Sequence, residues 1–251
     1  MRLRTTGGFS INLRWQELMF SLFFAAVAAF AAESLLPNGG FEQADAKDPS
    51  HPAGWDKVDG LGVVWTNAPK GSDGIERGKA IRIDTTHSEI AMCEQWKKTG
   101  LEKYVFPKPQ KNPIAETYGL SYYSDPIPVE KGQPYKVTFD YKSKFQGMLW
   151  VRGYGMLNNE KRRLWETKIE CRASADDWVT ISQEFWPTKY RPAVTEMRVM
   201  LYAYYPPGIY WYDNVKIEPI TEAEYNQMRA QGANVASPRK PSGRPAPTPR
   251  D

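Results

Sequence analysis

The feature of this sequence that most constrains its fold is the strict alternation in Tyr135–Lys142. The odd-numbered positions, which we expect to face a core, are Tyr135, Val137, Phe139 and Tyr141. The even-numbered positions carry Lys, Thr or Asp. A period of two places these two sets on opposite faces of a β-strand. The stretch therefore predicts a strand with one buried face and one polar face.

Similar short strands are predicted on both sides of this one. They are Lys79–Asp84, Met148–Met156, Trp178–Trp186, Met197–Tyr205 and Ile209–Ile217. Clusters of Gly, Pro and Asn separate them and predict turns. Many short strands at this spacing predict an all-β fold, a jelly-roll β-sandwich of two antiparallel sheets, which we place at residues 32–220.

The stretch Ile90–Pro128 fits this pattern poorly. It contains five prolines and scattered aromatic residues, and it shows little periodicity. One or two short strands are expected within it, around Met92–Trp96 and Tyr118–Tyr123. Since a long irregular segment in a compact domain is usually functional, we place it at one rim of the sandwich.

The two ends of the chain differ from its middle. Arginines precede the apolar run Met19–Ala32, which is too short to span a bilayer, so residues 1–31 are predicted to be a signal peptide. An uncleaved anchor is the alternative. Near the other end, Thr221 and Glu224 form a capping box that predicts a short helix over residues 221–232. The basic, proline-rich residues 233–251 are predicted to be a disordered tail.

The net charge of +4 is concentrated at these two ends. Three Arg against one Glu give residues 1–31 a charge of +2, and four basic side chains against Asp251 give residues 237–251 a charge of +3. Residues 32–236 are left with −1. Since nucleic-acid binding needs clustered cationic side chains, no nucleic-acid partner is expected. The near-neutral body suits an uncharged ligand.

Cys93 and Cys171 are the only cysteines, and their spacing does not match a metal site. In an exported protein they can pair, and a disulfide that closes so long a loop would contribute up to about 4 kcal/mol. We therefore expect a disulfide between Cys93 and Cys171. Two separately buried thiols are the alternative.

Three segments resemble those of a known domain family. They are Asn38-Gly39-Gly40-Phe41-Glu42 with Gly54-Trp55, then Gly132-x-x-Tyr135-x-Val137-x-Phe139, and finally Trp211-Tyr212-Asp213-Asn214-Val215. The pattern is similar to that of carbohydrate-binding modules of the cellulase C type (families four, nine and twenty-two), which have a galactose-binding-like jelly roll. The resemblance extends roughly over residues 35–219. It implies that the terminal strands lie near each other and share a structural calcium ion.

The resemblance brings Glu42 and Asp213 together as carboxylate ligands of that calcium ion, with backbone oxygens completing the shell. Asn38 or Asn214 could add an amide oxygen. Calcium prefers hard oxygen ligands of these kinds. On the residues alone, Asp213 could instead hydrogen-bond neighbouring backbone within a bulge.

Nine Trp and fourteen Tyr are many for a chain of this length. Period-two alternation in two of the predicted strands places aromatic and Arg side chains together, on the face opposite the apolar one. The six predicted ligand-binding residues are Trp150, Arg152, Tyr154, Arg198, Tyr202 and Tyr204. A flat ring stacks on the apolar face of a pyranose and brings large contact area at low entropy cost. Burial of these rings as a second small core is the alternative.

No catalytic motif accompanies this face. The two histidines lie well apart in the sequence, and His-Glu-x-x-His, Gly-x-Ser-x-Gly and glycine-rich phosphate loops are missing from it. We therefore expect a non-catalytic protein, secreted or located in the periplasm or cell envelope, that binds a neutral polysaccharide or glycan. A structural or adhesive envelope protein that contacts other proteins is the alternative, and a glycan-active enzyme is a third hypothesis.

Overall fold

The strand predicted at Tyr135–Lys142 forms β5 of the computed structural model, which describes residues 34–101, 106–175 and 177–235. The predicted alternation is confirmed, because the side chains at its four odd-numbered positions, 135, 137, 139 and 141, are buried. The described residues belong to one unit, Ala32–Asp251. The predicted signal peptide and residues 236–251 of the predicted tail lie outside the described residues. Neither described α-helix has the length and apolar character needed to cross a bilayer.

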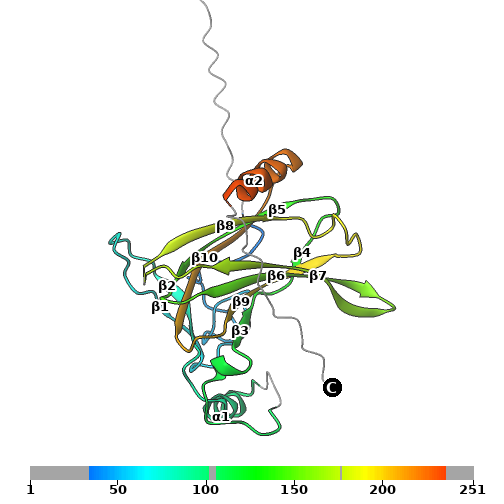
Figure 1. The fold of residues 1–251 in the computed structure, drawn as a ribbon. Coiled ribbons are helices and arrows are strands. Elements are labelled where there is room, and N and C mark those ends of the chain that lie inside the picture. The colour runs from blue at the N-terminus through cyan, green and yellow to red at the C-terminus, as the bar shows by residue number, and fades with distance from the viewer. Residues whose placement is uncertain (1–33, 102–105, 176, 236–251) are drawn as a thin grey trace, which may run out of the picture. The chain divides into compact units, whose positions relative to one another are not determined.

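The described strands pair in an antiparallel manner and form two sheets (Figure 1). The first has the order β1 (Val63–Asn67), β2 (Lys79–Asp84), β10 (Ile209–Pro219), β5 and β8 (Val179–Phe185). The second has the order β3 (Leu120–Tyr123), β9 (Glu196–Ala203), β6 (Gly147–Leu157) and β7 (Glu160–Cys171), and the two-residue β4 (Ile127–Pro128) also pairs with β9. The predicted all-β sandwich of two antiparallel sheets is confirmed.

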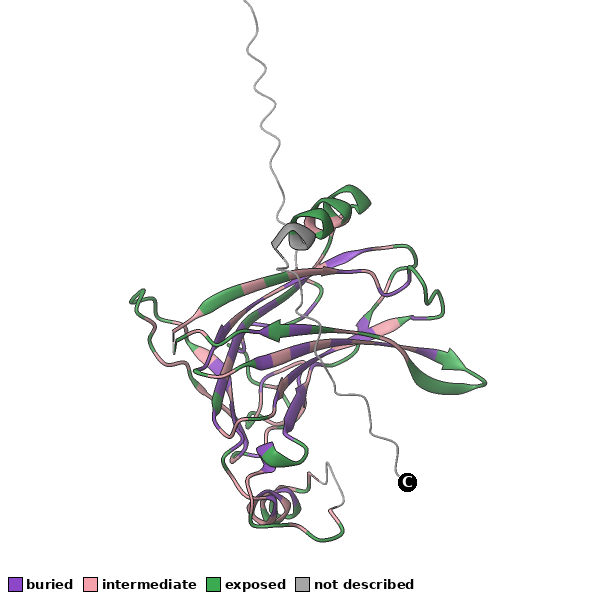
Figure 2. Cartoon of the chain, in the orientation of Figure 1, coloured by how far each residue is buried: buried purple, intermediate pink, exposed green. Residues whose placement is uncertain are grey.

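The inner faces of the two sheets share one hydrophobic core (Figure 2). Ile81 and Tyr212 enter it from the first sheet, and Leu149 and Val199 from the second. Burying a side chain of this size contributes roughly 1.5–3 kcal/mol relative to leaving it exposed. Because alternate residues of each strand face this core, the residues between them point to the outer faces of the sheets.

The β6–β7 hairpin projects beyond the neighbouring strands (Figure 1). Asn158 and Asn159 form its turn with positive φ angles of 52° and 61°, the backbone that a two-residue hairpin loop favours. Near the turn, Met156 and Leu157 are 59% and 52% exposed. The projecting part therefore presents apolar side chains outside the core.

The prediction of a strand at Met92–Trp96 is wrong, because these residues belong to helix α1 (Glu89–Thr99). The Ser88 side chain accepts a hydrogen bond from the Ala91 N–H at the start of the helix. Gly100 ends the helix in the left-handed conformation, with φ 72°. The short 3-10 helix η1 (Ile114–Glu116) then leads into β3.

The predicted capping box is confirmed at the start of helix α2 (Glu222–Val235). The Glu224 N–H donates to the Thr221 hydroxyl, and the Glu224 carboxylate accepts from the Thr221 N–H and hydroxyl. The helix continues past Gly232, so its predicted end is corrected to Val235. The Tyr225 ring packs edge-on against Trp186, next to β8.

Candidate functional site

The six predicted ligand-binding residues lie on the outer face of the second sheet or just beyond it. In β6, Leu149 and Val151 point into the core, while Trp150, Arg152 and Tyr154 are half-buried on the other face. In β9, the same alternation buries the apolar set and leaves Arg198 and Tyr202 half-buried. Tyr202 is directly opposite Met148 in the register, and Arg198 is opposite Arg152, so the two rows share one face.

A pocket of about 230 Å³ opens on this face. It is lined by Tyr118, Ser121, Tyr123, Trp150, Arg152, Met200 and Tyr202. Strands β3 and β6 supply its sides, and buried Met200 of the central strand β9 lies at its floor. Three of the six predicted residues therefore line one pocket.

Arg152 organises this pocket. Its guanidinium Nη1 donates a hydrogen bond of 2.7 Å to the Tyr123 hydroxyl, and its Nε lies 3.3 Å from the Glu166 carboxylate. The guanidinium carbon is 5.6 Å from the centre of the Trp150 ring, within the range of a cation–π contact. Arg152 is therefore held by contacts on several sides.

Arg198 and Tyr154 line a second pocket of about 230 Å³ on the same sheet. Its remaining lining residues are Pro126, Lys161 and Glu196. The Arg198 guanidinium donates to the Ser124 carbonyl at 2.6 Å and to Asp56 at 2.7 Å. The predicted face is therefore divided between two pockets, one mainly aromatic and one mainly charged.

Tyr204, the sixth predicted residue, lines neither of these pockets. Its ring stacks on Tyr202, with centroids 6.3 Å apart and an angle of 11° between the planes. The Tyr202 hydroxyl donates a hydrogen bond of 2.9 Å to the Tyr118 carbonyl. Tyr204 thus supports the wall of the first pocket from outside.

Tyr118 and Tyr123 are site residues that the sequence reasoning did not identify. Both come from the irregular stretch Ile90–Pro128, and Tyr118 is 50% exposed. The only signal was that they begin and end the expected strand Tyr118–Tyr123. The pairing of β3 with β9 that places Tyr123 is a long-range contact. The stretch is not one irregular loop, since it contains α1, η1, β3 and β4, and its strand β3 supplies part of the pocket.

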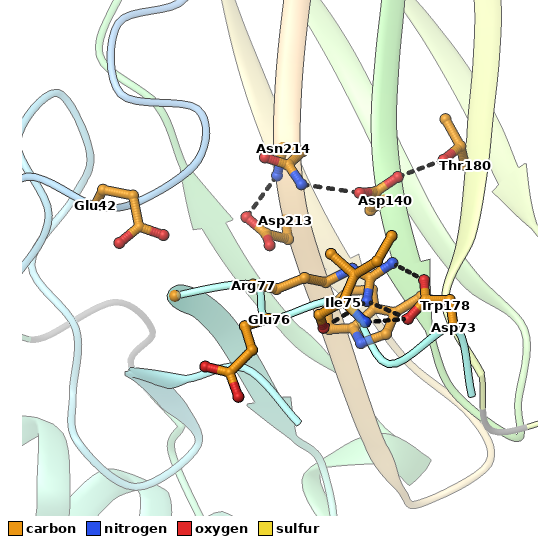
Figure 3. Close-up of a pocket in the computed structure, with 11 residues that line it drawn as sticks. Glu42, Asp73, Ile75, Glu76, Arg77, Asp140, Trp178, Thr180, Asp213 and Asn214 are labelled. Carbon is orange, nitrogen blue, oxygen red and sulfur yellow. Dashed lines mark hydrogen bonds and ion pairs between the residues drawn. The ribbon is translucent and has the colours of Figure 1, made fainter. Parts of the chain in front are cut away.

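The carboxylates Glu42 and Asp213 line a different pocket, of about 570 Å³, beside the first sheet (Figure 3). Its other lining residues are Asp73, Ile75, Glu76, Arg77, Gly78, Asp140, Trp178, Thr180 and Asn214. Glu42 accepts a hydrogen bond from the Lys79 N–H at 2.9 Å. The two ends of the folded chain therefore meet at this pocket, which agrees with the placement implied by the resemblance.

Asp213 is only 2% exposed, and Figure 3 shows its carboxylate between the side chains of Glu42 and Arg77. It accepts a hydrogen bond of 2.6 Å from the Asn214 N–H, at a register shift in the pairing of β10 with β5. Burial, together with the nearby charges of Asp140 and Glu42, raises the pKa of Asp213 to about 7. The alternative for Asp213, a hydrogen bond to neighbouring backbone, is therefore present. The Asp213 carboxylate also lies close to the acidic side chains of Asp140 and Glu42.

A metal ion at this pocket would depend on few side chains. Among the described residues, no group of three or more His, Cys, Asp and Glu side chains is arranged to hold a metal ion. Glu42 and Asp213 are two carboxylates of the kind calcium prefers, and the Asn214 side chain adds an amide oxygen. Glu42, Asp213 and Asn214 thus line one pocket, and a calcium ion held there stays a prediction.

The expected disulfide is not present, because Cys93 and Cys171 are both free thiols. Cys93 lies on helix α1, where a strand had been expected, close to Glu89 and Lys97. Cys171 ends β7 within the core, beside Tyr141 and Tyr212. Burial raises the pKa of both thiols, Cys171 more strongly. They are therefore two separate thiols, as in the alternative, although only Cys171 is buried and Cys93 is half-buried.

No family model matches this sequence, and no curated protein matches it. Solved structures with a similar fold include a family 61 carbohydrate-binding module, TmCBM61, in complex with β-1,4-galactotriose (11% identity, TM-score 0.41, covering 75% of this chain and 100% of that one). Another is the CBM22-1 xylan-binding domain of Paenibacillus barcinonensis Xyn10C (11% identity, TM-score 0.40, covering 76% and 96%). A third is the enzymatically active domain of bacteriophage CBA120 tailspike protein 4 (10% identity, TM-score 0.47, covering 74% and 21%).

The chain spans only 21% of that tailspike domain and 27% of an arabinose-bound α-L-arabinofuranosidase, MgGH51, which is also similar. A family 4 carbohydrate-binding module is matched over 99% of its length, at 15% identity and a TM-score of 0.39. The family 4 and family 22 modules are thus matched over nearly their full lengths.

Proposed function

We propose that this chain is a non-catalytic protein that binds a neutral glycan on the outer face of its second sheet. The observation that carries this proposal is the placement of the Trp150 ring beside the Arg152 guanidinium in an open pocket of that face. A pyranose presents apolar C–H groups on its faces and hydroxyls around its edge. An aromatic ring contacts the face, while guanidinium and hydroxyl groups hydrogen-bond the edge.

The charges around the pocket favour a neutral ligand. Arg152 is paired with Glu166, which also pairs with Arg163, and Arg198 is paired with Asp56. Each arginine that lines one of the two pockets therefore has a carboxylate partner. The described lining of the aromatic pocket contains neither a carboxylate nor a histidine. The paired carboxyl groups that most glycoside hydrolases use are therefore not supplied by that lining.

A glycan array and affinity electrophoresis on soluble neutral polysaccharides test this proposal. We expect at least one polysaccharide to retard the wild-type protein, and Trp150→Ala to remove the retardation. Wild-type migration unchanged by every polysaccharide, together with an empty array, would contradict the proposal.

A second candidate function, contact with other proteins of an envelope, is favoured by one observation. The projecting β6–β7 hairpin exposes Met156 and Leu157 beyond the sandwich. A variant carrying Met156→Ser and Leu157→Ser separates the two candidates. If glycan binding is the function, this variant is retarded in the polysaccharide gel as strongly as the wild type.

We also propose that the chain is exported and that Glu42 and Asp213 hold a structural calcium ion. Export is supported by the leader-like residues 1–31. The ion is supported by the burial of Asp213 and the raised pKa of its carboxyl group, since a bound cation would stabilise the ionised form. Calcium would neutralise these carboxylates and join the first residues of the domain to its last strand.

A further inference from the structure

Two hydrogen bonds divide the outer face of the second sheet. The first joins the Arg152 guanidinium on β6 to the Tyr123 hydroxyl on β3, at 2.7 Å, and so crosses the strand β9 between them. The second joins the Tyr202 hydroxyl on β9 to the Tyr118 carbonyl just before β3, at 2.9 Å. Trp150 lies between these two crossings on the β6 side. The face is therefore not the open row that alternation alone suggests.

The strand registers give the size of the space between the crossings. Along β6, the row of Tyr202 is four residues from Arg152, which at about 3.4 Å per residue is roughly 14 Å between backbones. On the β3 side, Tyr123 is opposite Met200, only two residues or roughly 7 Å from the row of Tyr202, so the space narrows towards β3. Across the sheet, β3 and β6 lie on either side of β9, about 10 Å apart.

The volume agrees with these dimensions. The pocket has about 230 Å³, whereas pockets for drug-sized ligands have roughly 300–1,000 Å³. An aromatic ring stands at one side, a thioether lies at the floor, and hydrogen-bonding groups stand at both ends. This is the space and chemistry for one pyranose ring.

The region beyond Arg152 differs in character. Arg152 and Arg198 face each other in the register, and this row of two guanidinium groups separates the aromatic pocket from the charged one. In the charged pocket Lys161 pairs with Glu196. A glycan chain that continued along the strands would have to pass over both arginines.

The second crossing is held by the rim segment. Tyr118 packs edge-on against Phe106, with ring centroids 4.8 Å apart, and Phe106 stacks on buried Trp96 of α1. Gly119 has a φ of 64°, and a Cβ at this position would lie 2.3 Å from the Ala203 carbonyl oxygen. Only glycine lets the chain approach β9 this closely, so Tyr118 is fixed at the end of the pocket.

We infer that this pocket takes a single pyranose residue, at a chain end or as a one-sugar branch, rather than an internal segment of a polysaccharide. The inference rests on the proposed glycan-binding function and specifies which part of the glycan is bound. Tyr118 and the Arg152–Tyr123 pair are the residues that determine this specificity, because they close the two ends of the pocket.

The test is a titration of the wild-type protein with β-1,4-linked gluco-, xylo- and galacto-oligosaccharides of one to six units. For the series that binds, we expect the affinity to change by no more than about threefold from the disaccharide to the hexasaccharide, less than half a decade of affinity. An affinity that rises by about tenfold or more over the same range would overturn the inference, since it requires contacts with several consecutive sugars.

Arg152→Ala provides a second readout. It removes the first crossing and one of the two guanidinium groups between the pockets, so the hexasaccharide should gain affinity relative to the disaccharide. Arg162→Ala, at the exposed hairpin tip, serves as the control and should leave the length dependence unchanged. A wild type that binds long chains through Trp150 overturns the single-sugar inference alone, whereas a wild type that binds no member of any series overturns the proposed function with it.

Discussion

Arg152 on β6 and Tyr123 on β3 are joined by a hydrogen bond of 2.7 Å that spans the intervening strand β9. The same guanidinium contacts the Trp150 ring at 5.6 Å and pairs with Glu166. A guanidinium is planar and presents its donors in a fixed fork, which an ammonium group does not. The geometry of the pocket therefore depends on arginine itself and not only on its charge.

Replacement of this arginine by lysine is the first prediction. Arg152→Lys should weaken glycan binding by about tenfold, which corresponds to about 1.4 kcal/mol. The melting temperature should change little, because ion pairs near the surface contribute about 1 kcal/mol or less. Arg162→Lys, which alters an exposed arginine paired with Glu160, should bind as the wild type does. Calorimetric titration measures both variants, and equal affinities for Arg152→Lys and wild type would contradict the prediction.

The second prediction concerns calcium. A ligand bound only by the folded state stabilises it by about 2.7 kcal/mol at a hundredfold excess over its dissociation constant. Chelation should therefore lower the melting temperature, and added calcium should restore it. Magnesium should substitute poorly, because it demands a tighter octahedral shell. Asp213→Asn should abolish the response to calcium, whereas Asp48→Asn, which changes a surface carboxylate elsewhere, should retain it. A wild-type transition unaffected by chelator and calcium would exclude the ion.

The third prediction is a pH dependence in the presence of chelator. The folded pKa of Asp213 is about 7, above its ordinary value of 3.8. As the pH rises from about 4 to about 7, the unfolded chain therefore releases this proton before the folded protein does, and stability falls. The loss levels off above the folded pKa and is at most about 4 kcal/mol, taking about 1.36 kcal/mol per pKa unit.

Urea unfolding of wild type and Asp213→Asn across this pH range measures the effect. The variant cannot release the proton, so its stability should decrease less steeply between pH 4 and 7, and the difference between the two profiles isolates this carboxyl group. Parallel profiles would show that Asp213 ionises equally easily in both states. In the presence of calcium and above pH 7, the wild type should be more stable than Asp213→Asn.

The fourth prediction follows from the two free thiols. In the folded protein, half-buried Cys93 should react slowly with an alkylating reagent, and buried Cys171 should not react until the protein unfolds, because only an accessible thiolate is reactive. Under denaturing conditions, mass spectrometry should find two modified cysteines. If the fully unfolded chain takes up no reagent, the two cysteines are bridged and the prediction of free thiols is wrong.

Alternation was sufficient to predict those parts of the fold in which one strand face is buried and the other is not. Strands β2 and β5 were predicted with their observed bounds, and the outward placement of Trp150 and Arg152 followed from the same period. Strand β7 was not predicted because its first half, in the projecting hairpin, is exposed on both faces and therefore shows no period.

Other elements depend on contacts that no local pattern reveals. Helix α1 buries only Glu89, Met92 and Trp96, so its apolar face is too narrow to produce a clear helical period. Its caps, Ser88 and Gly100, were the available signal. Tyr123 enters the pocket only because β3 pairs with β9, some eighty residues further along the chain, and such a pairing cannot be read from either segment alone.

Glycan binding by the aromatic pocket is tested most directly by the affinity of Trp150→Ala for the oligosaccharide that the wild type binds best on the array. Tyr190→Ala is the matched control, because it removes a ring that is 77% exposed and outside both pockets of the second sheet. We predict that Trp150→Ala loses most of the affinity while its melting temperature stays within a few degrees of the wild type, and that Tyr190→Ala binds normally. Unchanged binding by a folded Trp150→Ala protein would contradict this prediction.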